Sequence, residues 1–186
     1  MTTTDDTFEV RQRLESDLPG CMRLIATVHN VDRYPYKWPK DVRWLSPEYE
    51  LSAWVLVRGP DTIVGHVSLQ GLRRNEMSDL WSVGAGCDPD ELVAISRLFV
   101  DPACRGLQSG RLLAETAMRY ATKLGRRTVL DVAAHNQAAI HLYERMGFER
   151  VGMIEMKFDD DSVSIFAYIG PQLTECRRPV VSDGAT

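Results

Sequence analysis

Residues 105–110 have the side-chain types and spacing that suit a phosphate group. The segment reads Arg-Gly-Leu-Gln-Ser-Gly and joins an apolar, strand-like run to a long amphipathic run typical of a helix. The first N–H groups of a helix lack partners within it, so together with the helix dipole they attract an anion. Gly106 and Gly110 would open the backbone to a phosphate, and Arg105 adds a positive charge. The structural alternative is a plain turn in which Gly106 only supplies a positive φ.

A second group of residues follows downstream, where Asn136 precedes a short segment with helical periodicity that ends at Gly147. Asparagine is a favoured N-cap residue, and glycine is a favoured residue just after a helix. This predicted helix carries Tyr143, a side chain that is able to donate a proton to a reacting group. In the alternative interpretation, Tyr143 is a core residue in register with Ala139 and Met146.

The loop and the downstream Asn–Tyr helix together resemble the GNAT superfamily of acyl-CoA-dependent N-acyltransferases. In that superfamily the loop usually reads Arg or Gln, two residues, Gly, one residue, then Gly or Ala. Arg105 and Gly110 match this pattern, whereas Gln108 replaces the central glycine and would narrow the cradle or require another backbone angle. The resemblance implies acetyl-CoA as co-substrate. The residues that it implies for binding acetyl-CoA are Leu98, Phe99, Val100, Arg105, Gly106, Leu107, Gln108, Ser109, Gly110, Arg111, Asn136 and Tyr143.

The resemblance also implies direct transfer of the acetyl group to a primary amine through a tetrahedral intermediate. Tyr143 would then be the general acid toward the leaving thiolate, since tyrosine, with a reference pKa of about 10, is protonated at neutral pH. For the general base we favour Asp131, which precedes Asn136 on a predicted strand and corresponds to a glutamate base in some relatives that acetylate protein N-termini. A structural carboxylate is the alternative for Asp131. The rival candidates for the base are Glu91, Ser96 and His135.

The acceptor side of the site is predicted from an aromatic segment near the N-terminus. Tyr34, Tyr36 and Trp38, with Trp44 nearby, would line a pocket and hold a cationic amine by cation–π contact. In other interpretations, Lys37, Lys40 and Arg43 clamp a carboxylate, Asp32 binds the amine, or the aromatic rings only fasten the loop to the core. We favour a small-molecule amine as the acceptor. A protein N-terminal acetyltransferase and a non-catalytic acyl-CoA sensor are the alternative functions.

The elements that must position these residues predict an α/β (α+β) fold. We expect a mixed, mostly antiparallel central sheet of about seven strands, flanked by about four helices. Residues 1–170 would form a single domain and residues 171–186 a frayed tail. Residues 73–90 are predicted to be a polar loop. The predicted strands are residues 8–14, 51–57, 62–72, 92–100, 127–133, 148–158 and 162–169, and the clearest helices are residues 17–29, 107–124 and 136–147.

Composition limits the remaining classes of function. The chain has 186 residues, of which 44% are hydrophobic and 26% charged, as in a globular domain. A formal net charge of −4 argues against binding to nucleic acid or to an acidic membrane surface. No apolar run reaches the roughly 18 residues of a membrane span. The scattered cysteines are interpreted as reduced thiols, so we expect a cytoplasmic protein. Homodimerisation stays open. No metal site is expected, because the cysteines are scattered and form neither a CxxC pair nor a pattern with a histidine at ligand spacing. They are Cys21, Cys87, Cys104 and Cys176.

Overall fold

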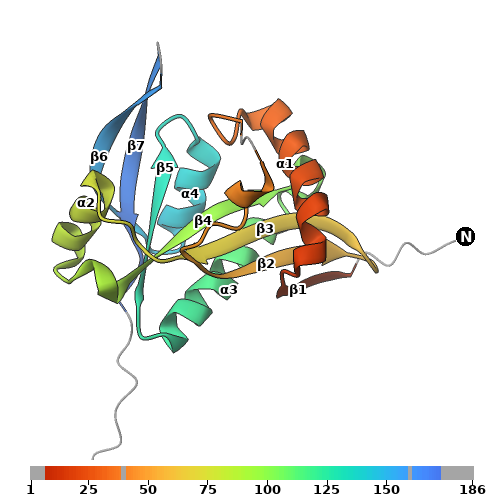
Figure 1. Ribbon diagram of the computed structural model, residues 1–186, viewed down its shortest axis with the longest axis horizontal. Coiled ribbons are helices and arrows are strands. Elements are labelled where there is room, and N and C mark those ends of the chain that lie inside the picture. Colours follow the sequence, from red (N-terminus) through yellow and green to blue (C-terminus); the bar gives the residue numbers. More distant parts are fainter. Residues whose placement is uncertain (1–6, 39–40, 159–160, 173–186) are drawn as a thin grey trace, which may run out of the picture.

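The computed structural model describes residues 7–38, 41–158 and 161–172, and its centre is one seven-stranded sheet (Figure 1). The strand order is β1-β2-β3-β4-β5-β7-β6, and every neighbouring pair is antiparallel except β4 and β5. The predicted mixed, mostly antiparallel sheet is therefore confirmed. The strands are β1 (Phe8–Gln12), β2 (Glu50–Arg58), β3 (Thr62–Gln70), β4 (Leu92–Val100), β5 (Arg127–Ala133), β6 (Glu149–Phe158) and β7 (Asp161–Ile169).

Four α-helices cover the two faces of the sheet (Figure 1). On one face, α1 (Leu18–Asp32) packs over β2, β3 and β4, and α2 (Glu76–Ala85) packs over β5, β6 and β7. On the other face lie α3 (Ser109–Lys123) and α4 (Gln137–Arg145), which share one large apolar cluster with the central strands. Because apolar layers lie on both sides, the central strands are nearly continuous runs of apolar residues.

The parallel strands β4 and β5 stay paired along only a short part of their length. Their register runs from Leu92 opposite Arg127 to Ala94 opposite Val129, yet β4 continues to Val100 and β5 to Ala133. Beyond the last pair the two strands diverge, as Figure 1 shows. The diverging ends leave backbone edges without a strand partner in the middle of the sheet, where a ligand is able to complete the hydrogen bonding.

One sequence prediction about the fold is wrong: the segment predicted as a polar loop, residues 73–90, contains α2. Asn75 caps this helix by accepting a hydrogen bond from the Ser78 N–H (2.9 Å), and the Ser78 hydroxyl oxygen accepts one from the Asn75 N–H. Gly86, with φ 67°, ends it in the left-handed conformation. Met77 and Trp81 bury one side of α2 against the sheet. Two buried apolar side chains on a single short helix are too weak a periodic signal to separate it from a loop.

The ends of other elements also differ from the prediction. The helix expected from residue 107 begins at Ser109, because Gly106 and Gln108 both have positive φ values, 78° and 60°. Helix α1 runs on to Asp32, and Arg33 rather than a glycine takes the left-handed position after it, with φ 57°. Residues 159–160, which lie between the predicted strands 148–158 and 162–169, and most of the predicted tail, residues 173–186, lie outside the described residues. None of the described helices combines the length and apolar character needed to cross a membrane.

Candidate active site

Asp131 lies on β5 beside the opening between β4 and β5. It lies two residues after Val129, the last residue of β5 that pairs with β4. Because side chains alternate along a strand, Asp131 points to the same face of the sheet as Val129. Val129 packs in the cluster around α2, so Asp131 faces the side of α1 and α2. Its side chain keeps contact with solvent, yet desolvation by the surrounding protein raises the pKa of the carboxyl above its ordinary value. A hydrogen bond from the backbone and the charge of Arg97 act in the opposite direction. A raised pKa suits a general base.

Tyr143 approaches the same opening from the other face. Its ring is buried on α4 against Phe148, with 5.5 Å between ring centroids. Burial raises the pKa of the hydroxyl, and the nearby Tyr34 and Asp131 raise it further, so the group stays protonated. Among the described residues the hydroxyl has no hydrogen-bond partner, and it is not sealed from solvent. This proton donor is therefore available to a ligand in the opening.

Asn136 positions α4 as the sequence predicts. Its side-chain oxygen accepts a hydrogen bond from the Ala139 N–H at 3.1 Å, so it caps the helix that carries Tyr143. Ile140, one turn before Tyr143 along the helix, is buried in the same cluster, and this fixes which side of α4 faces the sheet.

The predicted phosphate loop exposes a run of backbone donors. In the described structure the N–H groups of residues 106–111 make no hydrogen bond to a protein acceptor. A side chain on Gly106 would meet nothing within 4 Å, so the space beside it is open. Gly110 differs, because a β-carbon there would lie 3.4 Å from Leu142 and close to Leu98 and Val100. Gly110 thus allows α3 to pack closely, whereas the N–H groups remain open to an anion.

The two arginines of the loop segment are both paired. Arg105 donates two hydrogen bonds to Asp32 at the end of α1, so Asp32 does not face the acceptor side as a free carboxylate. Arg111 donates to Glu115 one turn later on α3, at 2.7 Å. Leu107 lies on the surface between them, 60% exposed.

The segment of β4 that the sequence assigns to the arm of acetyl-CoA borders the opening. Leu98 and Val100 pack on the side of α3, and Phe99 packs on the side of α1. The backbone edge of these residues that faces β5 has no strand partner, because pairing with β5 ends at Ala94. Packing by the side chains and binding by the backbone edge are therefore compatible here.

The aromatic segment before β2 is spread out rather than gathered into one pocket. Tyr34 lies at the opening, edge-on to Trp44 (6.3 Å), and both burial and the charge of Asp131 raise the pKa of its hydroxyl. The Tyr36 hydroxyl donates to Asp161 of β7 at 3.1 Å, while Trp38 packs against His29 of α1 at 5.1 Å. Of the cations that the sequence offered as a carboxylate clamp, Arg43 is paired with Asp41, and Lys40 lies outside the described residues.

The rival candidates for the base have different positions. Glu91 accepts a hydrogen bond from the Asp88 N–H before β4 begins, at the end where β4 and β5 are still paired. His135 is exposed in the turn between β5 and α4. Ser96 lies on β4 at the opening, where its hydroxyl oxygen accepts a long hydrogen bond from Arg97 (3.4 Å).

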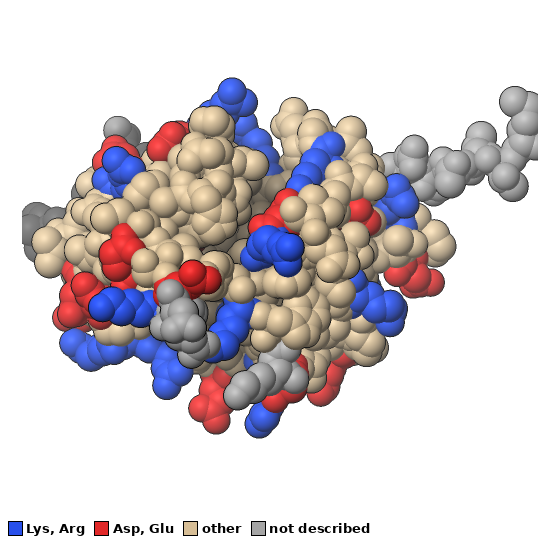
Figure 2. Space-filling model, turned by 90° about the horizontal axis from the view of Figure 1, so that it is seen from above, with Lys and Arg blue, Asp and Glu red and all other residues tan. Residues whose placement is uncertain are grey.

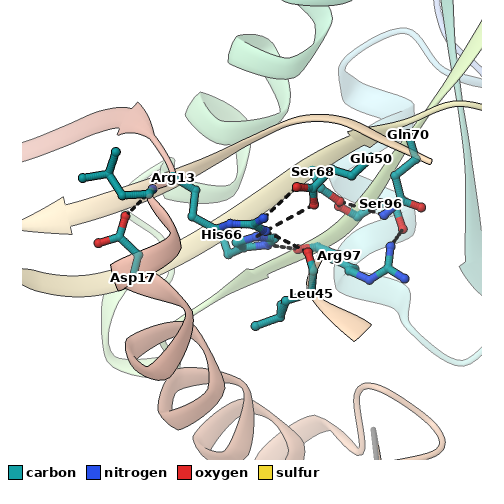
Figure 3. Close-up of polar contacts among 10 residues, drawn as sticks. Arg13, Asp17, Leu45, Glu50, His66, Ser68, Gln70, Ser96 and Arg97 are labelled. Atoms are coloured by element: carbon teal, nitrogen blue, oxygen red, sulfur yellow. Dashed lines mark hydrogen bonds and ion pairs between the residues drawn. The ribbon is translucent and has the colours of Figure 1, made fainter. Parts of the chain in front are cut away.

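A buried polar network next to the opening was not predicted from the sequence (Figure 3). His66 on β3 is fully buried, and its Nδ1 lies 2.8 Å from the carbonyl oxygen of Arg97. Arg13 donates to the Nε2 of His66 at 3.0 Å and is paired with Glu50. The only signals of this network in the sequence were His66 and Arg97, two polar residues within strands that are otherwise largely apolar.

Figure 2 looks down on the end of the molecule toward which β5 extends, and it shows a hollow between two lobes. Residues other than Lys, Arg, Asp and Glu, drawn in tan, form most of the surface around the hollow, and blue and red residues lie at its rim. In the described residues, no group of three or more His, Cys, Asp and Glu side chains is placed to hold a metal ion.

Comparison with known proteins agrees with this geometry. The sequence matches the model of the acetyltransferase (GNAT) family over residues 20–148, which include both the loop and the Asn–Tyr helix. The chain belongs to the GNAT family. This GNAT chain is 30% identical over 152 residues to the uncharacterized N-acetyltransferase MJ1207 of Methanocaldococcus jannaschii, and the match covers 80% of this chain. It is 44% identical over 66 residues, or 35% of the chain, to the mycothiol acetyltransferase of Rhodococcus erythropolis. The matches span 64% and 22% of those two proteins.

Solved structures show the same GNAT fold. An N-acetyltransferase from Staphylococcus aureus Mu50 superposes with a TM-score of 0.68 at 18% identity, covering 90% of this chain and 99% of the other. Arabidopsis thaliana NAA60 in complex with acetyl-CoA also gives a TM-score of 0.68, at 22% identity, covering 88% of this chain and 97% of the other. The predicted fold class is thus confirmed: a mixed, mostly antiparallel sheet of seven strands is flanked by four α-helices in the described residues.

Proposed function

We propose that this GNAT protein transfers the acetyl group of acetyl-CoA to the primary amine of a small molecule. One observation carries the proposal: a proton acceptor, Asp131, and a proton donor, Tyr143, approach one opening in the sheet from opposite faces. Transfer between an amine and a thioester needs both groups, because the amine loses a proton and the departing sulfur gains one.

The described residues fit acetyl-CoA as a co-substrate. The free N–H groups of residues 106–111, at the positive end of α3, suit the pyrophosphate. The backbone edge of Leu98–Val100 suits the amide groups of the pantetheine arm, which would lie in the opening as an additional strand. Bound acetyl-CoA would supply an acetyl group activated as a thioester.

The side chains at the opening divide the proton transfers between them. Asp131 faces the side of α1 and α2, which we call the acceptor side, and takes the proton of the amine directly or through one water molecule. Tyr143, on the side of α3 and α4, gives its proton to the sulfur as the carbon–sulfur bond breaks. The amine nitrogen forms the new bond to the acetyl carbon, and the products are an N-acetylated amine and the free thiol of coenzyme A. Atoms and charges balance once Asp131 releases its proton to solvent and Tyr143 takes one back.

A contact across the acceptor side favours a small acceptor over a peptide. Tyr36, in the segment after α1, donates a hydrogen bond to Asp161 at the start of β7. This contact joins the segment on the β4 side of the opening to the hairpin on the β5 side, so it restricts the space through which a long peptide would pass.

The test is thiol release from acetyl-CoA with a panel of amino acids, polyamines, aminoglycosides and short peptides. Turnover with at least one small amine, and none with peptides of several residues, is the expected result. Turnover with peptides alone would replace the acceptor class. Stoichiometric binding of acetyl-CoA without release of thiol across the panel would favour an acyl-CoA sensor instead.

The pH dependence of turnover tests the base. Since the pKa of Asp131 is raised, its carboxyl is protonated over a wider range of acidic pH, and kcat/KM should fall as the pH drops through that raised pKa. Asp131→Asn should remove this acidic limb and lower kcat by about 100-fold or more. Asp131→Glu should retain the limb. An unchanged limb in Asp131→Asn would assign the base to another group.

A further inference from the structure

Arg97 stands at an irregularity of β4 that turns its side chain toward the acceptor side. Ala94 and Phe99 both pack on the side of α1 and α2, although residues five positions apart point to opposite faces in a regular strand. The pairing with β3 steps from Phe99 opposite His66 to Ser96 opposite Ser68, and Arg97 has φ 51°. This is a β-bulge, with one residue more on β4 than on β3.

Among the residues that the structure describes, the guanidinium of Arg97 has no counterion. No described carboxylate oxygen lies within 4.0 Å of a guanidinium nitrogen of Arg97, the distance limit for an ion pair. Its Nε is buried without a hydrogen-bond partner, and Nη1 makes only the long bond to the Ser96 hydroxyl. The guanidinium lies over the ring of Trp44, 5.0 Å from its centroid. A partly buried cation with unused donors is unfavourable unless an anion joins it.

The backbone around Arg97 is held firmly by the network in Figure 3. Arginine is only a donor, so the Nε2 of His66 accepts from Arg13, and the Nδ1–H of His66 donates to the carbonyl of Arg97. The Ser68 hydroxyl donates to the carbonyl of Ser96 at 3.1 Å. Two consecutive carbonyl groups of the bulge are therefore fixed by buried donors. Such support orients a binding side chain more precisely than a mobile loop does.

Arg97 and Asp131 present opposite charges to one opening without neutralising each other. They make no ion pair, yet the charge of Arg97 lowers the pKa of Asp131. The pKa of Tyr34 is sensitive to both charges, since Asp131 raises it and Arg97 lowers it. Continuing the register beyond Ala94 opposite Val129 would place Ser96 opposite Asp131. Arg97, the next residue, therefore lies at about the same distance along the opening as Asp131. A ligand that bridges the two sites must carry an anionic group on one side and an ammonium group on the other.

We infer that Arg97 binds the carboxylate of the acceptor, and that the acceptor is an α-amino acid or a close zwitterionic analogue. The inference rests on the proposed function. The planar fork of a guanidinium matches a carboxylate with two parallel hydrogen bonds, while Trp44 stacks behind it. With the carboxylate held there, the amine of the acceptor is directed to Asp131, where its proton leaves.

The test compares free amino acids with their amides, which keep the amine and lose the negative charge. Wild-type protein should have kcat/KM values at least about 30-fold higher for its best free amino acid than for the matching amide. Arg97→Gln should abolish that preference by raising KM for the free amino acid, with less change in kcat. Arg97→Lys should recover only part of the preference, because lysine keeps the charge without the fork.

A matched control is Arg150→Gln, which removes an arginine that lies over Phe166 at the edge of the sheet. This variant should keep the wild-type preference. Equal turnover of amino acids and amides by the wild type, or an unchanged preference in Arg97→Gln, would overturn the inference but leave the acetyl transfer standing.

Binding separates failure of the inference from failure of the proposed function. Calorimetric titration of the same pairs, with coenzyme A present, reports on Arg97 even if no thiol is released. If no thiol is released, free amino acids that still bind to wild type and not to Arg97→Gln would support the carboxylate site, and only the acetyl transfer would be refuted. Absence of amino-acid binding by the wild type would overturn the inference.

Discussion

Arg105, at the start of the phosphate loop, is tied to Asp32, the last residue of α1. Its Nη1 donates to Oδ1 of Asp32 at 3.0 Å, and its Nη2 donates to Oδ2. The two residues come from segments far apart in the sequence, and both side chains are partly exposed. The positive charge that suits a phosphate is thus already shared with a carboxylate, so a phosphate bound by residues 106–111 must compete with Asp32 for it.

Asp32→Asn should therefore tighten binding of coenzyme A. Removing the carboxylate leaves the full charge of Arg105 to the pyrophosphate, and a partly exposed ion pair of this kind contributes at most about 1 kcal/mol. We expect Kd for coenzyme A to fall about two- to fivefold by calorimetry, with the largest effect at low salt. Asp41→Asn, which breaks the exposed pair with Arg43, is the control and should leave Kd unchanged. Weaker binding in Asp32→Asn would mean that the carboxylate orients Arg105.

Tyr143 and Tyr168 are both buried, but removal of their hydroxyl groups should have opposite effects on turnover and stability. The Tyr143 hydroxyl has no hydrogen-bond partner in the described protein, whereas that of Tyr168 donates to Glu144 at 3.0 Å. Tyr143→Phe should lower kcat by about 100-fold or more and leave stability and coenzyme A binding nearly unchanged. Tyr168→Phe should keep kcat and lower the free energy of unfolding by about 1 kcal/mol. Full turnover by Tyr143→Phe would refute its role as general acid.

His66 makes the stability of the fold depend on pH. Burial lowers its pKa from 6.5 to about 3. The hydrogen bond to the carbonyl of Arg97 acts in the opposite direction, and the charges of Arg13 and Arg97 lower the pKa further. Between these two values the unfolded chain binds a proton that the folded chain does not, so stability falls as the pH drops from 6.5 toward 3. At pH 7 and above, both states are neutral at this residue, and its hydrogen bonds are fully retained.

The slope from His66 alone should approach about 1.4 kcal/mol per pH unit within that window. His66→Asn keeps an N–H donor near the carbonyl of Arg97 but has no group that titrates there. Urea unfolding of both proteins from pH 7.5 to pH 4 should therefore give curves of stability against pH that converge as the pH falls. Parallel curves would show that His66 is not the group responsible.

How much of this molecule its sequence predicts depends on the length of each signal. The long apolar run of β4 and the strong amphipathic pattern of α3 identified both elements, and Asn136 marked the start of α4. Helix α2 was missed because it is short and its cap, Asn75, stands in a polar run. The β-bulge at Arg97 was missed because one extra residue leaves no trace in a strand that is apolar on both faces.

In the candidate site, too, the sequence predicted the positions of some residues and not of others. Asp131 and Tyr143, chosen from a motif, do approach one opening, because the motif fixes the strand and helix on which they lie. The aromatic residues were expected in one pocket, yet Trp38 packs on α1 and Tyr36 reaches β7, since periodicity carries no information about the path of an irregular segment. The pairing of Arg105 with Asp32 depends on tertiary contacts and has no signal in the sequence.

Gln108 lies just before α3 in the left-handed conformation, with φ 60° and ψ 11°. That conformation costs an L-residue with a side chain roughly 1–2 kcal/mol, whereas glycine adopts it freely but loses more entropy on folding. Gln108→Gly should therefore raise the free energy of unfolding by about 0.5 kcal/mol. It should not weaken binding of coenzyme A, because the N–H groups of the loop stay open.

Ser109→Gly, one position later, is the matched control for this prediction. Ser109 is the first residue of α3, and its hydroxyl donates to the carbonyl of Cys104 at 3.1 Å, so glycine there removes a buried hydrogen bond and relieves no strain. Urea unfolding should show Ser109→Gly destabilised by about 1 kcal/mol, opposite in sign to Gln108→Gly. Equal destabilisation of both variants would mean that the Gln108 side chain makes stabilising contacts that outweigh its backbone strain. Looser coenzyme A binding in Gln108→Gly alone would instead give that side chain a direct part in holding the ligand.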